Sequence, residues 1–302
     1  MSTTPRPPAG SYHAGLLGAG IRGSFSPALH EHEAAALGIP GRYELLDLDE
    51  LAAGPADLGA LIAGARAAGW QGLYVTHPCK QAVIPHLDAL APDAAAIGAV
   101  NTIVFGPDLA VGHNTDWSGF ARGLDVGFPR GLDEQDLAEV VLLGAGGAGS
   151  AVGHALLTRG VRRLHVVDRL DERSAGLTRT LAARFPGRAV EHAGLGALAD
   201  LLPRATGLVQ ATPVGMTGHP GTPVPARLLH AGLWVADVVN RPLRTELLAA
   251  ARALGCRTLD GGPMLVLQAA DGIALLTGHR PDDDRMLADF HRIVAAGDRH
   301  GG

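Results

Sequence analysis

The sequence predicts an α/β fold made of two α/β domains, and three observations support this prediction. Short runs rich in valine, leucine and isoleucine alternate with longer segments in which alanine and leucine recur at helical spacing, a pattern typical of parallel sheets covered by helices. The chain has 302 residues, of which 47% are hydrophobic, so it is long enough for two domains with buried cores. A polar linker near its middle separates two series of such units.

The first series of units precedes this linker. Residues 1–15 are expected to be a disordered lead-in, because proline and glycine interrupt the apolar run that a signal peptide needs. A helix is expected to start near Ser26, with Ser26 as its N-cap and Pro27 as its first residue. Strands are expected at residues 14–18, 43–48, 72–76 and 101–105, and helices at 26–38, in the stretch before Gly69 and at 93–97.

The second series follows the linker, which lies at about residues 125–136 and is the expected domain boundary. The chain is expected to close with two helices, which follow the last strand. The expected strands lie at residues 140–143, 164–168, within 207–215 and at 233–239, and the closing helices at 263–277 and 282–296.

Composition and charge narrow the kind of partner. The net charge is −5, the isoelectric point lies near 6.3 and no basic block occurs, so neither nucleic acid nor a membrane is expected to bind, whereas a small molecule is. Cys79 and Cys256 are isolated and lack the paired spacing of a zinc or redox motif, so we expect no metal and a reducing cytoplasm. Cys79 lies beside Lys80, where a nucleophile is the alternative, and is expected to be a small buried side chain. A monomer or a homodimer is expected.

The segment GAGGAG is a candidate dinucleotide-binding turn of a Rossmann-type domain. It follows an apolar run and opens a helix, the setting that such a fingerprint requires. The first glycine permits the tight turn, the second lets the backbone approach a pyrophosphate at the helix N-terminus, and the third lets helix and strand pack closely. A turn without a ligand is the alternative in a chain with 42 glycines. The candidate cofactor-binding residues here are Gly144, Gly146, Gly147, Ala148 and Gly149.

Asp168 ends the next expected strand, roughly twenty residues after the last of these glycines. A carboxylate at this position accepts hydrogen bonds from the adenosine ribose and repels a 2′-phosphate, which favours NAD over NADP. Arg169 follows it, and its guanidinium could stack on adenine or pair with a 2′-phosphate. NADP therefore stays open as the alternative cofactor.

Lys80 is the only lysine among the 25 lysine and arginine residues of the chain. Arginine serves equally well as a surface charge or a carboxylate clamp, whereas proton transfer needs a group that can release its proton once burial or a nearby charge tunes it. Lys80 follows the strand expected at residues 72–76, where open α/β sheets place ligand crevices, so it is a candidate acid and base. A leftover surface charge is the alternative. Asp116 is the candidate carboxylate partner, with an ordinary helix N-cap as its alternative.

Five short motifs occur in a fixed order along the chain. They are SFSPALH, VTHPCK, GAVNT, NTDWSGF and MLVLQA. Together they resemble the Ser-x-Ser-Pro, Thr-x-Pro-x-Lys, paired Asn-Thr and late glutamine motifs of the shikimate dehydrogenase family. The resemblance extends from about Gly15 to Phe290, and THPCKQAV with Asp168 looks most like the NAD-using quinate/shikimate branch.

The resemblance implies a site for a polyhydroxylated cyclohexane carboxylate, which offers one charge and several hydroxyls for recognition. It implies that Ser24 and Ser26 hold the substrate carboxylate through their hydroxyls, and that Lys80 and Asp116 are the catalytic pair. The remaining implied ligands of the substrate are Thr76, Asn101 and Gln268.

The late position of Gln268 implies that the chain returns to its first domain. We therefore expect a substrate-binding domain at 1–118, completed by C-terminal helices within 261–302, and a Rossmann NAD(P)-binding domain at 119–260, with the substrate in the cleft between them. Thr212 and Gly215, after the third strand of the second domain, are further cofactor-binding candidates.

Three positions depart from the family pattern. Tyr74 stands where asparagine usually precedes Val-Thr, Gln210 where asparagine usually opens the Ala-Thr-Pro segment, and Asn240 where tyrosine usually precedes x-Pro. A short amide in place of a phenol at position 240 enlarges and rehydrates the substrate pocket, where Asn240 is a candidate substrate-binding residue. This change fits the additional hydroxyl of quinate and also an amino analogue.

These features predict a cytoplasmic enzyme that reversibly oxidises the ring hydroxyl of quinate or shikimate to the 3-dehydro ketone with hydride transfer to NAD(P). Its pathway would be aromatic amino acid biosynthesis or quinate catabolism. One alternative is a dehydrogenase of an amino analogue, aminoshikimate or aminoquinate. Another is a non-catalytic NAD-binding sensor of the same fold, which the three departures suggest and the intact Lys80 and Asp116 argue against.

Overall fold

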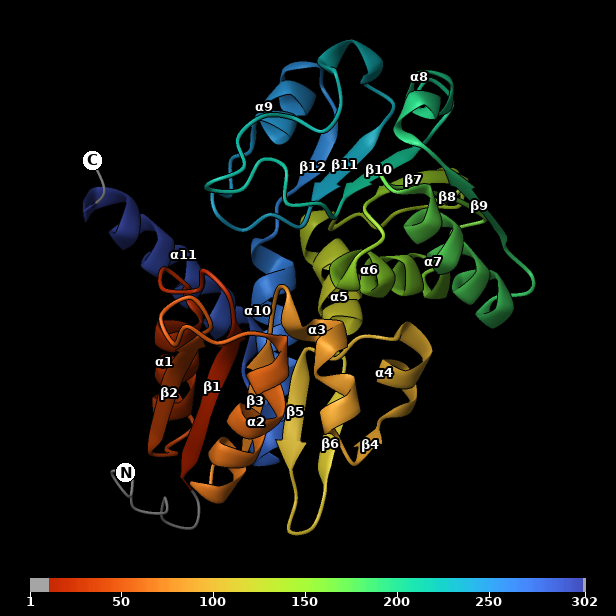
Figure 1. The fold of residues 1–302 in the computed structure, drawn as a ribbon. Coiled ribbons are helices and arrows are strands. Elements are labelled where there is room, and N and C mark those ends of the chain that lie inside the picture. The colour runs from red at the N-terminus through yellow and green to blue at the C-terminus, as the bar shows by residue number, and fades with distance from the viewer. Residues whose placement is uncertain (1–10, 301–302) are drawn as a thin grey trace. The chain divides into compact units, whose positions relative to one another are not determined.

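The structure, a computed structural model, describes residues 11–300, with side chains to residue 296. The chain forms two units: one ends at Thr115 and resumes at Val266, and the other runs from Asp116 to Leu265. Each unit contains one six-stranded sheet with helices on it, which confirms the expected α/β fold (Figure 1). Residues 1–10 of the expected lead-in lie outside the described residues, whereas the first strand already begins at Tyr12, earlier than expected.

The first unit is built on a mixed sheet with strand order β2-β1-β3-β5-β6-β4. Its strands are β1 (Tyr12–Gly18), β2 (Gly41–Asp47), β3 (Gly72–Val75), β4 (Ala89–Leu90), β5 (Thr102–Phe105) and β6 (Ala110–His113). Its helices are α1 (Ser26–Ala36), α2 (Leu58–Ala67), α3 (Cys79–Ala82), α4 (Pro92–Ile97), most of α10 (Gly262–Thr277) and α11 (Asp283–His300). The expected parallel pairing holds for β1 with β2 and β3 and for β4 with β6, whereas β5 pairs antiparallel with both β3 and β6. A short turn, and not a crossover helix, joins β5 to β6, and such a turn permits only antiparallel pairing.

Helix α1 begins one residue earlier than expected. Ser26 is its first residue and not its N-cap, because Phe25 occupies the cap position without a side-chain bond. The N–H of Ser26 instead donates to Oγ of Ser24 at 3.2 Å. The Ser-x-Ser pattern offers two hydroxyls near the helix start, and the earlier one satisfies a free backbone donor there.

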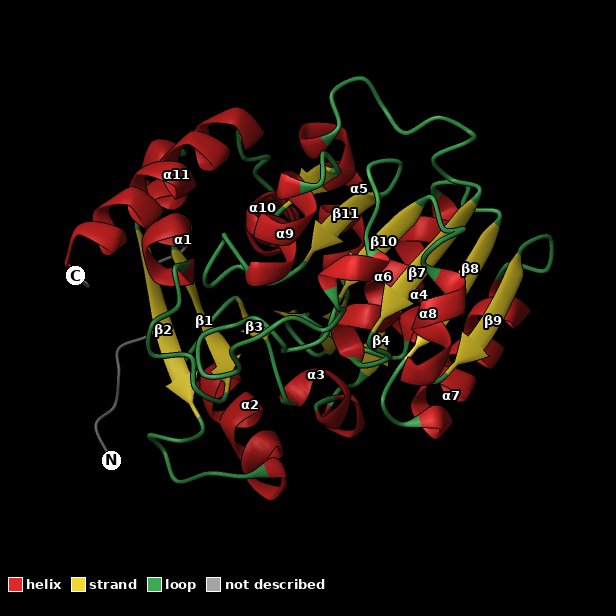
Figure 2. Cartoon of the chain, turned by 90° about the horizontal axis from the view of Figure 1, so that it is seen from above, coloured by secondary structure: helices red, strands yellow, loops and turns green. Residues whose placement is uncertain are grey.

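The two C-terminal helices complete the first unit. Helix α11 packs beside α1 in Figure 1 and Figure 2, and a bidentate ion pair joins them. Nη2 of Arg285 lies 2.6 Å from Oε1 of Glu33 and Nε lies 3.0 Å from Oε2, with Glu33 1% exposed. The pair connects residues 252 positions apart, and the same buried carboxylate also accepts a hydrogen bond from the N–H of Asp282 at 3.1 Å.

The second unit holds an all-parallel sheet with strand order β12-β11-β10-β7-β8-β9, which can be followed in Figure 2 from β11 to β9. Its strands are β7 (Glu139–Leu143), β8 (Arg163–Val167), β9 (Ala189–Ala193), β10 (Gly207–Gln210), β11 (Trp234–Asp237) and β12 (Arg257–Leu259). Its helices are α5 (Asp116–Gly127), α6 (Gly147–Thr158), α7 (Asp171–Arg184), α8 (Leu198–Leu201) and α9 (Glu246–Ala253). Because α5 extends to Gly127, it includes the first residues of the expected linker.

Strand β7 shows why this sheet was recognisable in the sequence. Val140 and Leu142 face the helices α5, α6 and α7, whereas Val141 and Leu143 face α8 and α9. A central strand that is buried on both faces reads as an uninterrupted apolar run. The chain turns to β8 on one side of β7 and to β10 on the other, so a topological switch point lies at the carboxyl end of β7.

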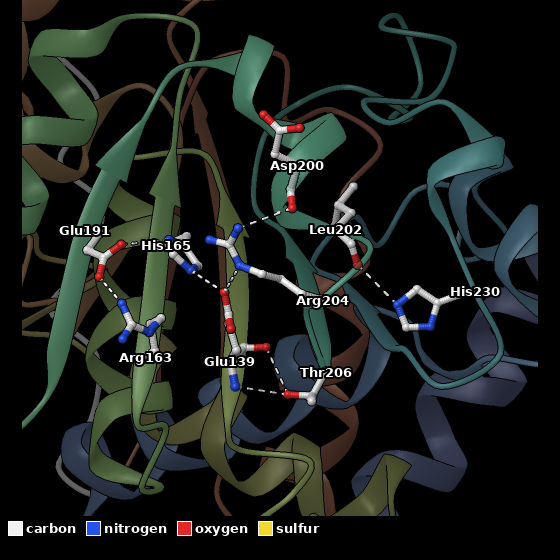
Figure 3. A network of polar contacts seen from close by, with 9 residues as sticks. All are labelled: Glu139, Arg163, His165, Glu191, Asp200, Leu202, Arg204, Thr206 and His230. Carbon is white, nitrogen blue, oxygen red and sulfur yellow. Dashed lines mark hydrogen bonds and ion pairs between the residues drawn. The ribbon is translucent and has the colours of Figure 1, made fainter.

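A polar network lies toward the amino ends of the same strands (Figure 3). Oε1 of Glu139 accepts a hydrogen bond from Nε of Arg204 at 2.7 Å and lies 2.8 Å from Nε2 of the buried His165. Burial opposes ionisation of this carboxyl, yet the hydrogen bonds from Arg204 and His165 hold the pKa of Glu139 below its usual value. The network lies at the opposite end of β7 from the glycine-rich turn, so we assign it to the scaffold of the unit.

Candidate active site

The glycine-rich turn follows β7 directly. Two of its glycines leave no room for a side chain, whereas a third borders open space. Gly144 has a φ of +100°, and a Cβ there would lie 2.7 Å from the carbonyl oxygen of Ala211. A Cβ on Gly149 would lie 1.9 Å from the carbonyl oxygen of Gly144, so the protein's own packing requires glycine at both positions. At Gly146, by contrast, no atom lies within 4 Å of the position a Cβ would take. The second glycine therefore leaves open space beside the N-terminus of α6, where Gly147 and Ala148 form the first turn.

Asp168 follows β8 and is 8% exposed. Its Oδ2 accepts a hydrogen bond from the N–H of Ala145 at 2.8 Å, and its Oδ1 accepts one from the N–H of Leu170 at 2.9 Å. The carboxylate thus ties the glycine-rich turn to the end of the neighbouring strand. Each oxygen can accept a further hydrogen bond, so this arrangement is compatible with a ribose diol. Arg169, next to it, is exposed.

Gln210 organises the loop that follows β10. The side chain is fully buried, and its Nε2 lies within 3.0 Å of both oxygens of Thr212 and 2.8 Å from the carbonyl oxygen of Val214. Its Oε1 accepts a hydrogen bond from the N–H of Thr212 at 3.0 Å. These bonds explain why a glutamine can stand here, and they fix the segment that carries Thr212 toward Gly215, where φ is +97°. The sequence marked Gln210 only as a departure, although a buried amide at a strand end needs partners.

The two serines expected to hold a carboxylate lie together in the first unit. Oγ of Ser24 is 3.1 Å from Oγ of Ser26, and the N–H of Ser24 donates to the carbonyl oxygen of Ile21 at 2.8 Å. Ser26 is 7% exposed at the start of α1, and Ser24 is half-buried. Two hydroxyls are therefore presented side by side by one short loop.

Asp47, at the end of β2, holds this loop from behind. Its Oδ1 accepts a hydrogen bond from the N–H of Gly20 at 3.0 Å, and its Oδ2 accepts bonds from Ile21 at 2.8 Å and Arg22 at 3.1 Å. Asp47 is 3% exposed. Three backbone donors of the loop are therefore already bound to a carboxylate. Asp47 was not among the candidates from the sequence, although it ends a strand of an open α/β sheet, where ligand-site residues gather.

Asn101 and Gln268 come together across 167 positions of the chain. Nδ2 of Asn101 lies 3.1 Å from Oε1 of Gln268 and 2.9 Å from Oγ1 of Thr115. Oγ1 of Thr115 also donates to the carbonyl oxygen of Gln268 at 2.9 Å. The backbone N–H of Thr115 donates to Oδ1 of Asn101 at 2.7 Å. Thr115 was not a candidate from the sequence, and it connects Asn101 and Gln268, which were.

Lys80 lies in α3, immediately after β3. The carbonyl oxygen of Thr76 accepts a hydrogen bond from the N–H of Cys79 at 2.8 Å. The carbonyl oxygen of Lys80 accepts one from the N–H of Val100 at 2.8 Å, and this bond ties the short helix to the segment preceding Asn101. Lys80 is half-buried, while Cys79 is buried, as expected for a small apolar side chain. Asp116 is 4% exposed at the start of α5 and belongs to the second unit. The pairing of Lys80 with Asp116 stays a prediction.

Three further observations complete the description of residues 11–300. Asn240 is half-buried beyond β11 in the second unit, and its expected contact with substrate stays a prediction. Within residues 11–300, no group of three or more histidine, cysteine, aspartate or glutamate side chains could hold a metal ion. In the same part of the chain, no helix combines the length and the hydropathy needed to cross a membrane.

The fold and these side chains define a class of protein: a two-unit α/β protein whose all-parallel unit has the architecture of a Rossmann dinucleotide-binding domain. The family model for the shikimate dehydrogenase substrate binding domain matches residues 16–103. The chain is 55% identical over 284 residues to a shikimate dehydrogenase (NADP(+)) of Streptomyces avermitilis, which covers 94% of this chain and 96% of the relative. The chain belongs to the shikimate dehydrogenase family, which confirms the resemblance noted in the sequence.

Relatives named for both cofactors are similar to this chain. A quinate/shikimate dehydrogenase (NAD(+)) of Corynebacterium efficiens is 44% identical over 277 residues, covering 91% of this chain and 96% of the relative. The solved structure of quinate dehydrogenase from Corynebacterium glutamicum in complex with NAD is similar to this chain with a TM-score of 0.85 and 42% identity. The match covers 93% of this chain and 99% of that one. The two groups of relatives therefore do not decide between NAD and NADP.

Proposed function

We propose that this protein reversibly oxidises the ring hydroxyl of quinate or shikimate to the 3-dehydro ketone, with a nicotinamide cofactor as the hydride acceptor. The observation that carries the proposal is the hydrogen bond between Asn101 and Gln268, because it joins two of the family's polar motifs in one cluster of hydroxyl and amide groups. A structure of the family from Listeria monocytogenes, 28% identical to this chain, contains shikimate and NAD. This supports a cyclohexane carboxylate as the substrate class.

The substrate carries one negative charge and several hydroxyls, and the first unit offers matching groups. Ser24 and Ser26 would donate to the carboxylate, since Asp47 already uses the backbone donors of their loop. Thr76, Asn101 and Gln268 would bind the ring hydroxyls as neutral donors and acceptors. A site of neutral donors and acceptors distinguishes analogues by the hydroxyls that they offer.

Oxidation of an alcohol also requires removal of the hydroxyl proton. Lys80 would accept this proton as its neutral amine, and Asp116 would orient the amine and stabilise the ammonium group that forms. An arginine in the place of Lys80 keeps the positive charge but cannot accept a proton in the physiological range. This difference separates proton transfer from simple charge stabilisation.

The residues of the second unit fit a nicotinamide dinucleotide. The space beside Gly146 would accommodate the pyrophosphate, which the N–H groups at the start of α6 would bind. When bound, the nicotinamide ring supplies the hydride-accepting carbon. Asp168 would bind the hydroxyls of the adenosine ribose, and we therefore propose NAD as the preferred cofactor, with Arg169 as the residue that would permit NADP.

The test compares Lys80→Ala with Lys80→Arg. Both variants should bind NADH with the affinity of the unchanged protein, and both should lose at least about 100-fold in kcat, the lower range for a general acid or base. The measurements are steady-state rates with quinate and shikimate, and NADH affinity from nicotinamide fluorescence. If Lys80→Arg retained the kcat of the unchanged protein, Lys80 would act through charge alone and the proton-transfer role would be withdrawn.

A further inference from the structure

A cluster of four aromatic rings lies buried within the first unit, between the sheet and the helices on one of its faces. Its members are Tyr12 on β1, His30 on α1, Tyr43 on β2 and Tyr74 on β3, each at most 6% exposed. The hydroxyl of Tyr12 lies 2.7 Å from Nδ1 of His30 and 3.2 Å from the hydroxyl of Tyr74. The ring of Tyr74 is 4.5 Å from that of His30 and 5.7 Å from that of Tyr43, centroid to centroid. Three neighbouring rings thus fix the position of Tyr74.

Burial keeps this cluster neutral. It lowers the pKa of His30 to about 3 and raises the pKa of Tyr74 well above its usual value. Neither side chain therefore changes charge near neutral pH. The cluster acts through packing and hydrogen bonds, and the position of Tyr74 does not depend on pH in that range.

On its other side Tyr74 lies against helix α10 at Gly272. A Cβ added to Gly272 would lie 2.3 Å from Cε1 of Tyr74 and 2.9 Å from its hydroxyl oxygen, far inside contact distance. The ring thus occupies the volume that any larger residue at position 272 would need. A glycine in the interior of a helix costs about 1 kcal/mol relative to alanine, so its place here calls for a packing reason, and the tyrosine supplies one.

The contact belongs to a regular register between β3 and α10, which run alongside each other (Figure 1). A Cβ on Gly72 would lie 3.1 Å from Cδ2 of Leu276, and Tyr74 meets Gly272. Two residues along a strand advance about 6.6 Å, close to the roughly 6 Å of four residues along a helix. Continued by one more step beyond the end of β3, the same register would place Thr76 opposite Gln268. Both are residues for which we propose substrate contacts.

We propose that Tyr74 and Gly272 are a size-matched pair that sets the distance between β3 and α10 and thereby positions Gln268 for the substrate. This inference rests on the function proposed above, because it explains the position of Gln268, one of the residues proposed to bind the substrate. Gln268 lies one helical turn before Gly272, and its bonds to Asn101 and Thr115 have lengths of 3.1 and 2.9 Å. A shift of α10 of about 1 Å would break both. Tyr74 and Gly272 thus act through Gln268, as positioning residues.

The test is a double-mutant cycle with Gly272→Ala, Tyr74→Asn and the combined variant. Gly272→Ala should raise the KM for shikimate or quinate by about 10- to 100-fold, since a misplacement of about 1 Å can cost that much. The affinity for NADH should stay unchanged. With Asn at position 74 the collision is absent, so adding Gly272→Ala should change the KM by no more than about 3-fold. Gly64→Ala in α2 is the matched control, because no atom lies within 4 Å of its added Cβ.

The outcomes separate the proposal from the function on which it rests. An unchanged KM in Gly272→Ala, or an equal rise in both backgrounds, would overturn the size-matched pair. If Gly272→Ala fails to fold, the combined variant decides: a folded, active protein supports the pair, and a protein equally unable to fold overturns it. Gln268→Ala tests the substrate contact by itself, since an unchanged KM there would withdraw the role of Gln268 whatever the cycle shows.

Discussion

Replacing Gly146 with alanine would add one methyl group where the protein leaves room for it. No atom lies within 4 Å of the position of the added Cβ, and the backbone φ of −83° suits alanine. Alanine is a poorer N-cap than glycine, but it gives up less conformational entropy on folding. These opposing effects should leave the free energy of unfolding within about 1 kcal/mol of that of the unchanged protein.

The expected loss lies in cofactor binding alone. A backbone N–H donates to a phosphate oxygen at about 2.9 Å, whereas a methyl carbon keeps other atoms at about 3.5 Å or more. The pyrophosphate would have to withdraw and give up at least one charge-assisted hydrogen bond. Such a bond contributes about 1.5–3 kcal/mol, so the Kd for NADH should rise by about 10- to 100-fold.

Nicotinamide fluorescence measures this Kd, and thermal unfolding measures stability on the same samples. Gly176→Ala in α7 is the matched control, because its added Cβ would have only Nη2 of Arg179 near it, at 3.9 Å. Gly176→Ala should keep the Kd for NADH and the thermal stability of the unchanged protein. An unchanged Kd in Gly146→Ala would refute the assignment of the turn to the pyrophosphate.

Two further predictions concern buried carboxyl groups. Burial raises the pKa of Asp237 from 3.8 to about 6, so this group favours the folded state fully below about pH 4 and loses that contribution, about 3 kcal/mol, as the pH rises through 6. Urea unfolding between about pH 4.5 and pH 7 should therefore show a fall in stability that Asp237→Asn removes; an equal fall in the variant would contradict this origin. Asp47→Asn removes the charge that holds the Ser24 loop, and should raise the KM for quinate or shikimate by about 10-fold without changing the Kd for NADH. A KM equal to that of the unchanged protein would show that the loop keeps its shape without Asp47.

The central strands and the glycine-rich turn of the second unit were predictable because their signals are local, whereas its two edge strands, β9 and β12, were not expected. The apolar run of β7, the glycines of the turn and the acidic residue after β8 follow one another within about thirty residues, and each has a short-range physical reason. The first sheet was predicted less well. The antiparallel pairing of β5 depends on the turn after Phe105, and a sequence pattern of apolar runs does not show strand direction.

The polar residues missed in the sequence share one property, namely that their partners lie in other segments. Asp47 binds backbone groups about 25 positions earlier in the chain, and Thr115 joins residues of two distant motifs. Tyr74 was recognised as unusual, but its reason, Gly272, lies nearly two hundred residues later. Such relations follow from tertiary packing and not from spacing along the chain.

The most direct test of the proposed function is the initial rate at which the purified protein reduces the cofactor in each pairing of quinate or shikimate with NAD or NADP. We predict turnover of at least one of the two acids with NAD, and a much smaller kcat/KM with NADP, because the carboxylate of Asp168 repels a 2′-phosphate. Turnover with NADP alone would contradict the role of Asp168 and favour Arg169. No turnover in any pairing would contradict the proposed oxidation itself and would favour an amino analogue as the substrate or a non-catalytic sensor.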